Sequence, residues 1–158
     1  MFSCGYQRSV RLSAPIETVF AFHLDPANLR LISPPWTPVA RLTLPPRLIP
    51  GARVDLEVRV FGLVPQRWVV EIMTVEAPTR LVDTALTSPF RRWRHTHAFR
   101  AVGAGTEMTD SVEYDPPLGF LGRWLDPVVT RPMLAAMFRY RHTQTAALLL
   151  ANQLRAES

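Results

Sequence analysis

The chain has 158 residues, of which 47% are hydrophobic and 20% charged, a composition typical of one globular domain spanning residues 1–158. All 18 basic residues are arginines, and they are spread along the sequence instead of forming the basic block of a nucleic-acid-binding protein. Despite the net charge of +5, we therefore expect no nucleic-acid partner. Cys4 is the single cysteine, which excludes an intrachain disulfide and a thiolate metal site.

The first residues lack the pattern of a signal peptide, and no apolar run approaches the ~20 residues of a membrane helix. The expected location is the cytoplasm, without stable membrane insertion.

The N-terminal quarter of the chain predicts one strand and two short helices. Residues 3–12 form the strand, and Pro15 with Glu17 marks the first turn of a helix. Asp25 caps a second short helix that begins with Pro26 and ends near Ile32.

The middle of the chain predicts six strands. They cover residues 37–44, 54–60, 68–77, 80–87, 91–102 and 106–114, with the first as an edge strand because prolines surround it.

A long helix follows, predicted to start at Pro127 and to run to about Leu154. Pro132 either bends it or marks its regular start. The expected inner stripe comprises Val129, Met133, Ala136, Met137, Tyr140, Ala147 and Leu148.

This order of elements predicts an α+β fold in which a curved, seven-stranded antiparallel sheet wraps around the long C-terminal helix. The two short helices lie between the first and second strands. Only the long helix is large enough to cover one face of the sheet. Because a single helix cannot fill a wide curved sheet, we expect a cavity between them.

Two histidines alternate on the strand 91–102. Trp93, His95, His97 and Phe99 share one face, since side chains of a strand point to the same side at every second residue. A two-residue turn at Gly103-Ala104 places His97 opposite Asp110.

Asp83 lies two residues after Leu81 on the neighbouring strand, so both side chains are expected to point to the inner face of the sheet. Asp83, His95, His97 and Asp110 are therefore candidates for one cluster beneath the helix.

Three roles for this cluster remain open. The first is a structural or ligand-orienting role, in which the histidines and aspartates satisfy each other's hydrogen bonds. The second is a general acid/base pair, and the third is a site for zinc or iron. Nothing else on this face supplies a metal-binding spacing, so we expect neither a metal ion nor a cofactor.

The candidate ligand-binding residues outside this cluster are large and mostly apolar. Trp36 is presented stiffly by Pro34-Pro35 near the mouth of a cavity, whereas each of the others is also compatible with ordinary core packing. These others are Trp68, Trp93, Met133, Met137 and Tyr140. His142 has no evident partner and is expected on the surface.

Several motifs resemble the START-like, helix-grip superfamily, the SRPBCC proteins, over nearly the whole chain. Residues 14–23 with Asp25, Asn28 and Leu29 are similar to the opening helix pair of that superfamily. Ser88-Pro89-Phe90 with Trp93, His95 and His97 resembles a bacterial ligand-binding, cyclase/dehydrase-like branch, although that branch has glycine where Ser88 stands. Residues 131–133 and 138–142 resemble its long helix.

The resemblance implies the helix-grip fold but does not select a chemistry, because this fold hosts binders, carriers and enzymes. Our first hypothesis is a non-enzymatic protein that binds a hydrophobic small molecule, such as a lipid or a polyketide. The second is a polyketide cyclase/dehydrase in which His95 or His97 moves a proton and Asp83 or Asp110 sets its tautomer. The third is a protein-interaction partner.

Overall fold

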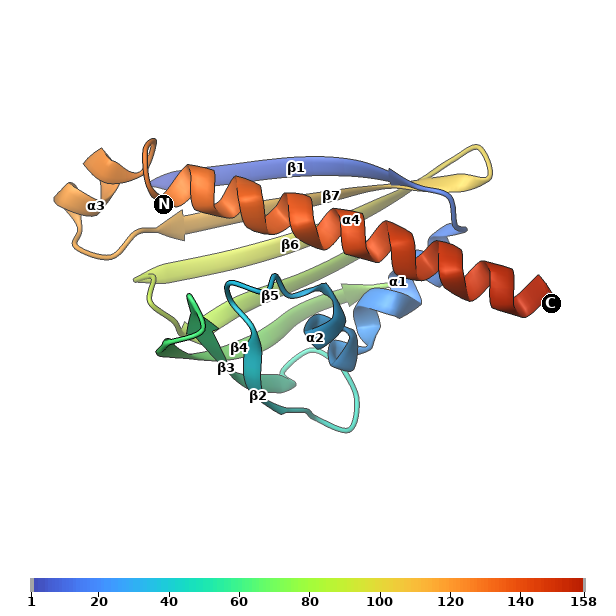
Figure 1. Ribbon diagram of the computed structural model, residues 1–158, viewed down its shortest axis with the longest axis horizontal. Helices are drawn as coiled ribbons and strands as arrows, with labels where there is room; N and C mark the ends of the chain where they lie inside the picture. The colour runs from blue at the N-terminus through green and yellow to red at the C-terminus, as the bar shows by residue number, and fades with distance from the viewer. Residues whose placement is uncertain (1, 158) are drawn as a thin grey trace.

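The chain folds in the predicted order: one strand, short helices, six strands and a long helix (Figure 1). The computed structural model describes residues 2–157. The elements are β1 (Cys4–Leu12), α1 (Ile16–Leu24), the 3-10 turn η1 (Pro26–Asn28), α2 (Leu29–Ile32), β2 (Val39–Thr43), β3 (Arg53–Val60), β4 (Val64–Glu76), β5 (Arg80–Thr87), β6 (Arg92–Val102), β7 (Gly105–Asp115), α3 (Phe120–Leu125) and α4 (Thr130–Glu157).

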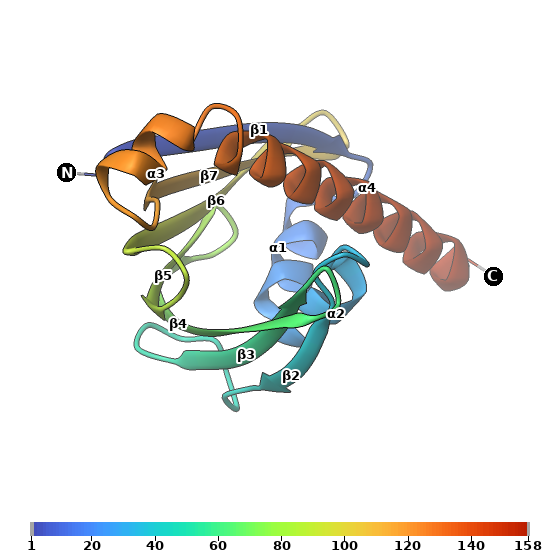
Figure 2. The same cartoon turned by 60° about the vertical axis from the view of Figure 1, so that its left-hand side comes forward.

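All seven strands form one antiparallel sheet in the order β1-β7-β6-β5-β4-β3-β2. The first strand thus pairs with the last, and β2 lies at the other edge, as its prolines predict. Figure 2 shows the sheet curving from β1 round to β2, with α4 crossing its concave side beside α1 and α2. Neither α4 nor any other described helix has an apolar stretch long enough to cross a lipid bilayer.

The register of β6 and β7 matches the prediction, and Asp83 on β5 lies on the predicted face. Val102 pairs with Gly105 across the two-residue turn, in which Gly103 takes a φ of 60°. Consequently His97 stands opposite Asp110, and His95 stands opposite both Val112 on β7 and Asp83 on β5. Alternation along these strands brings one histidine pair and two aspartates to the concave face.

The long helix differs from the prediction in its start. α4 begins at Thr130 instead of Pro127, and Pro132 lies in its first turn, where a proline costs no intrahelical hydrogen bond.

The buried face of α4 also differs from the predicted stripe. Buried positions recur at helical spacing as Thr130, Leu134, Phe138, His142, Thr145 and Leu149. Of the predicted stripe, Val129, Met133 and Ala147 are exposed, and Ala136, Met137, Tyr140 and Leu148 are half-buried. The prediction followed the apolar residues, but the helix turns three polar side chains toward the sheet.

The core consists of two apolar clusters with polar residues between them. One cluster contains Phe20, Leu81, Phe99, Met108 and Leu149 with their neighbours. The second is formed by Trp93, Val112, Tyr114, Leu134 and Phe138.

Four polar residues lie between these two clusters: His95 and His97 on β6, Asp110 on β7 and His142 on α4. The fold therefore surrounds a small group of polar side chains with packed apolar ones.

Candidate functional site

A cavity of about 440 Å³ lies between the concave face of the sheet and α4. Its wall is mainly apolar, with side chains such as Leu56, Val58, Val70 and Phe138. The predicted residues Trp36, Trp68, Trp93, Met133 and Met137 all line it, and so do Asp83, His95, His97 and Asp110. Tyr140 does not line the cavity; its ring packs edge-on against Trp36, with the ring centroids 5.5 Å apart.

Asp110 is the centre of the polar part of the wall. His95 donates from Nε2 to Oδ1 of Asp110 at 2.9 Å, and His142 donates from Nε2 to Oδ2 at 2.5 Å. Nδ1 of His97 lies 2.6 Å from Oδ1, although its N–H direction is poorly aligned for a hydrogen bond. One buried carboxylate is thus surrounded by three imidazoles from β6 and α4.

These imidazoles determine the charge of Asp110. Burial alone raises the pKa of a carboxyl group, because it removes water from the charged form. The charge of His97 and the hydrogen bonds from His142 and His95 oppose that effect and hold the pKa of Asp110 well below its usual value. Asp110 is therefore an anion that fixes the orientation of the rings around it.

Asp83 lies in a different environment, although it belongs to the same group. Its Oδ2 is 3.7 Å from Nδ1 of His95, which is too long for a hydrogen bond. Burial raises the pKa of Asp83 to about 6, while His97 and Arg141 partly oppose the rise. The two carboxyl groups thus differ in proton affinity, as their environments require.

Arg141 and His142, on adjacent positions of α4, are the two site residues that sequence reasoning missed. His142 is 3% exposed and lies on the sheet side of the helix, so its expected surface position is wrong. Arg141 lines the cavity; burial lowers the pKa of its guanidinium, and attraction to Asp110 and Asp83 opposes this. The four-residue spacing from Leu134 to Phe138 to His142 is the sequence signal that indicates the burial of His142. We call Asp83, His95, His97, Asp110, Arg141 and His142 the polar cluster.

His23, on α1, adds a further imidazole beside this cluster. Its Nδ1 donates to the carbonyl oxygen of Val19 at 2.8 Å, and its ring centroid is 5.2 Å from that of His97. Burial, together with the charge of His97, lowers the pKa of His23 to about 4. His23 is therefore neutral at physiological pH, and its Nε2 is a hydrogen-bond acceptor.

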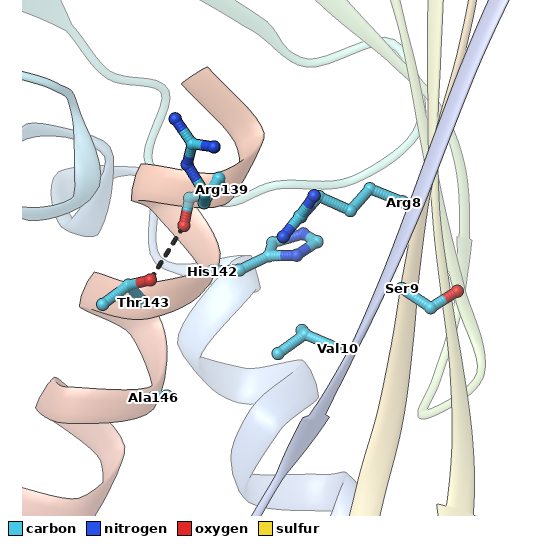
Figure 3. A pocket seen from close by; sticks show the side chains of 7 residues that line it. All are labelled: Arg8, Ser9, Val10, Arg139, His142, Thr143 and Ala146. Atoms are coloured by element: carbon cyan, nitrogen blue, oxygen red, sulfur yellow. Dashed lines mark hydrogen bonds between the residues drawn. The ribbon is translucent and has the colours of Figure 1, made fainter. Parts of the chain in front are cut away.

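A second, smaller pocket of about 290 Å³ lies on the other side of His142, between β1 and α4 (Figure 3). Figure 3 shows the guanidinium of Arg8 beside the His142 ring, and Arg8 is the β1 residue opposite Asp110. Nε of Arg8 and Nδ1 of His142 are buried without a hydrogen-bond partner among residues 2–157. His142 thus separates the outer pocket from the cavity.

Comparison with solved structures places the fold among known ones. The CV1439 protein of Chromobacterium violaceum superposes with a TM-score of 0.75, at 17% identity over 92% of this chain and 97% of that chain. The TTHA0849 protein of Thermus thermophilus gives 0.72, at 19% identity over 92% and 99%. A point mutant of norcoclaurine synthase from Thalictrum flavum, in complex with a transition-state analogue, gives 0.71 at 16% identity over 95% and 96%.

At these identities the likeness shows the fold alone, and it confirms the helix-grip architecture that the sequence motifs implied. A comparison with curated protein sequences finds no significant match. The family model described as "Polyketide cyclase / dehydrase and lipid transport" matches residues 3–149, nearly the whole chain. The protein therefore belongs to the polyketide cyclase/dehydrase and lipid-transport family.

Proposed function

We propose that this protein binds a hydrophobic small molecule, such as a lipid or a polyketide, and carries or sequesters it without changing it. The observation that supports this most directly is the cavity itself, with its mainly apolar wall and a polar cluster on one side. Its volume of about 440 Å³ lies within the range of small-molecule sites, about 300–1,000 Å³. The family description also includes lipid transport.

The two parts of the wall suggest what kind of molecule fits. The apolar part, with Leu56, Val58 and Trp68, favours a hydrocarbon or aromatic skeleton, because each Å² removed from water contributes about 25 cal/mol. The polar cluster offers imidazole nitrogens and Asp83, which pair with a hydroxyl, phenol or carbonyl group. We infer a ligand with an extended apolar body and a polar group at one end.

The test is to fill the cavity. Met137 is half-buried on α4 and lines the cavity, whereas Leu150 is exposed on the same helix. Met137→Trp should occupy the ligand's space, and Leu150→Trp adds the same ring outside it. Native mass spectrometry of the purified chain and displacement of a fluorescent fatty acid measure binding, and thermal unfolding checks the fold.

Loss of binding in Met137→Trp, with wild-type binding in Leu150→Trp, supports the proposal. The proposal fails if the wild-type chain captures no apolar molecule in either assay. It also fails if both folded variants bind as the wild type does.

A second function, that of a cyclase/dehydrase, is favoured by one observation. Asp110 receives the Nε2 hydrogen of His95, so Nδ1 of that ring is the nitrogen that faces Asp83 on the cavity wall. This arrangement suits a general base beside a carboxyl group whose pKa is about 6.

With a linear poly-β-ketone as substrate, cyclisation that disappears in His95→Gln while binding persists would favour this second function. Binding without turnover in the wild type would favour the carrier.

A further inference from the structure

Three potential metal ligands converge on the cavity wall. Asp83 comes from β5, and His95 and His97 come from β6, each offering one donor atom; these atoms all lie within 4.8 Å of one another. The sheet produces this convergence, because Asp83 is directly opposite His95 and the two histidines alternate on one strand face. All three side chains line the cavity, so space is open in front of them.

Asp110 orients the His95 imidazole for this role. It accepts a hydrogen bond from Nε2 of His95 at 2.9 Å, which leaves Nδ1 of that ring available, and its Oδ1 lies 2.6 Å from Nδ1 of His97 without a well-aligned hydrogen bond. A histidine that ligates a metal usually gives its second ring nitrogen to a carboxylate in this way.

When Nδ1 of His95 carries no proton, its lone pair faces Oδ2 of Asp83 at 3.7 Å. Two electron-rich atoms that face each other repel unless a proton or a cation lies between them.

We propose that Asp83, His95 and His97 form a binding site for a first-row divalent transition metal ion, with zinc foremost. Two imidazole nitrogens and one carboxylate oxygen are a donor set that zinc and iron accept and that calcium and magnesium do not favour. Bonds of about 2.0–2.2 Å place tetrahedral ligand atoms roughly 3.4 Å apart. The 3.7 Å between Asp83 and His95 is close to this spacing, and the other donor separations, all within 4.8 Å, shorten as the three side chains close around the ion.

The remaining coordination positions face the cavity, where water or an oxygen atom of a bound molecule completes the shell. The site does not depend on the proposed carrier function, because an ion can bind to the three side chains without an organic ligand. From the sequence we expected no metal ion at these residues, because the hydrogen bond by which Asp110 orients the His95 ring is evident only in the structure.

Arg141 provides a test whose direction is specific to a cation. Its buried guanidinium is attracted by Asp83 and Asp110, the same carboxylates that a divalent ion would use or approach. Replacing it by an uncharged side chain of similar length removes a positive charge beside the site. Arg141→Met should therefore bind the metal several-fold more tightly, whereas removal of a ligand weakens binding.

The experiment uses the full, untagged chain after treatment with a chelator. Zn²⁺ is titrated by calorimetry, and Co²⁺ by the visible absorption that reports its ligand geometry. We expect a single equivalent per chain in the wild type.

His97→Ala and Asp83→Asn should each lower the affinity by more than about 100-fold, since even an orienting partner is worth 10–100-fold. Thr143→Ala is the control, because Thr143 is exposed on α4 and lies outside the three donors.

Circular dichroism and thermal unfolding show which variants retain the fold. Two metal-ligand variants are used because the test needs only one of them to be folded. The proposal is overturned if the wild type binds no stoichiometric ion. It is equally overturned if a folded His97→Ala or Asp83→Asn chain binds as tightly as the Thr143→Ala control. Capture of an apolar molecule in the presence of a chelator is measured separately, so failure of the metal site and failure of the carrier function are distinguishable.

Discussion

His142 donates a hydrogen bond from Nε2 to Oδ2 of Asp110 at 2.5 Å and thereby joins the long helix α4 to strand β7 of the sheet. Both residues are almost fully buried, at 3% and 2% exposure. Removing a carboxylate from water is costly, and the cost is offset only when its lone pairs receive hydrogen bonds. This contact is therefore structural as well as a part of the candidate site.

We predict that His142→Ala lowers the free energy of unfolding by about 2–4 kcal/mol. The variant removes one of the hydrogen bonds to a buried anion and leaves a cavity in the interface between helix and sheet. Thr143→Ala is the control, because Thr143 is exposed and its hydroxyl donates only to the carbonyl of Arg139 in the same helix. Urea unfolding of both chains measures the difference, and equal stabilities would show that the contact with Asp110 contributes nothing.

The sheet side of this contact was predictable from local sequence. The Gly103-Ala104 turn and the alternation of side chains determine that His97 stands opposite Asp110, and the structure has this register. The helix start was less predictable. Pro127 and Pro132 are both acceptable in a first turn, and the sequence alone does not choose between them.

The helix side of the contact was not predictable in the same way. His142 lies 32 residues from Asp110 in the chain, and its burial depends on a partner that only the folded structure supplies. A stripe chosen by apolar residues therefore selected Met133 and Tyr140, which flank the buried face. The position of Arg141 was unpredictable for the same reason. An arginine is expected at the surface, but the two carboxylates that attract Arg141, those of Asp83 and Asp110, lie on the sheet.

The second prediction concerns pH and His23. In the unfolded chain its pKa is 6.5, whereas burial lowers it to about 4 in the fold. The folded state therefore binds fewer protons between these values, so the stability contributed by neutral His23 is complete above pH 6.5 and is lost as the pH falls toward 4. The gap corresponds to about 3 kcal/mol.

His23→Gln should flatten this loss. Urea unfolding between about pH 7 and pH 4, in the presence of a chelator, measures it. Asp83 acts with the opposite sign: its raised pKa makes the folded state bind more protons below about pH 6, so Asp83→Asn should steepen the loss. Parallel curves for wild type and His23→Gln would contradict the prediction.

The third prediction concerns Trp36 at the edge of the cavity. Trp36 lines the cavity at 37% exposure, contacts Tyr140, and accepts a hydrogen bond from the backbone N–H of Phe61 at its carbonyl oxygen. Trp36→Ala should accelerate dissociation of a fluorescent fatty acid by about fivefold, since an aromatic contact contributes about 1 kcal/mol. The free energy of unfolding should change little, because Trp36 is not a core residue.

Trp124→Ala is the control for this change. Trp124 is also an exposed tryptophan, at 71%, but it lies on α3 and does not line the cavity. Stopped-flow measurement of dissociation compares the two variants. If Trp36→Ala releases the fatty acid no faster than Trp124→Ala, then Trp36 does not retain the ligand.

The fourth prediction concerns Gly105, where the backbones of β1 and β7 are too close for a side chain. A Cβ atom at this position would lie 2.5 Å from the carbonyl oxygen of Leu12, whereas a Cβ at Gly5, near the other end of the same strand pair, would meet Val112 at an ordinary 3.7 Å. Gly105→Ala should lower the free energy of unfolding by about 1–3 kcal/mol, as overpacking does, and Gly5→Ala should be nearly neutral. Because Gly105 directly follows the turn that sets the register of His97 and Asp110, Gly105→Ala should also weaken binding of the fatty acid. Equal unfolding curves for the two variants would show that β1 and β7 can separate here at no cost.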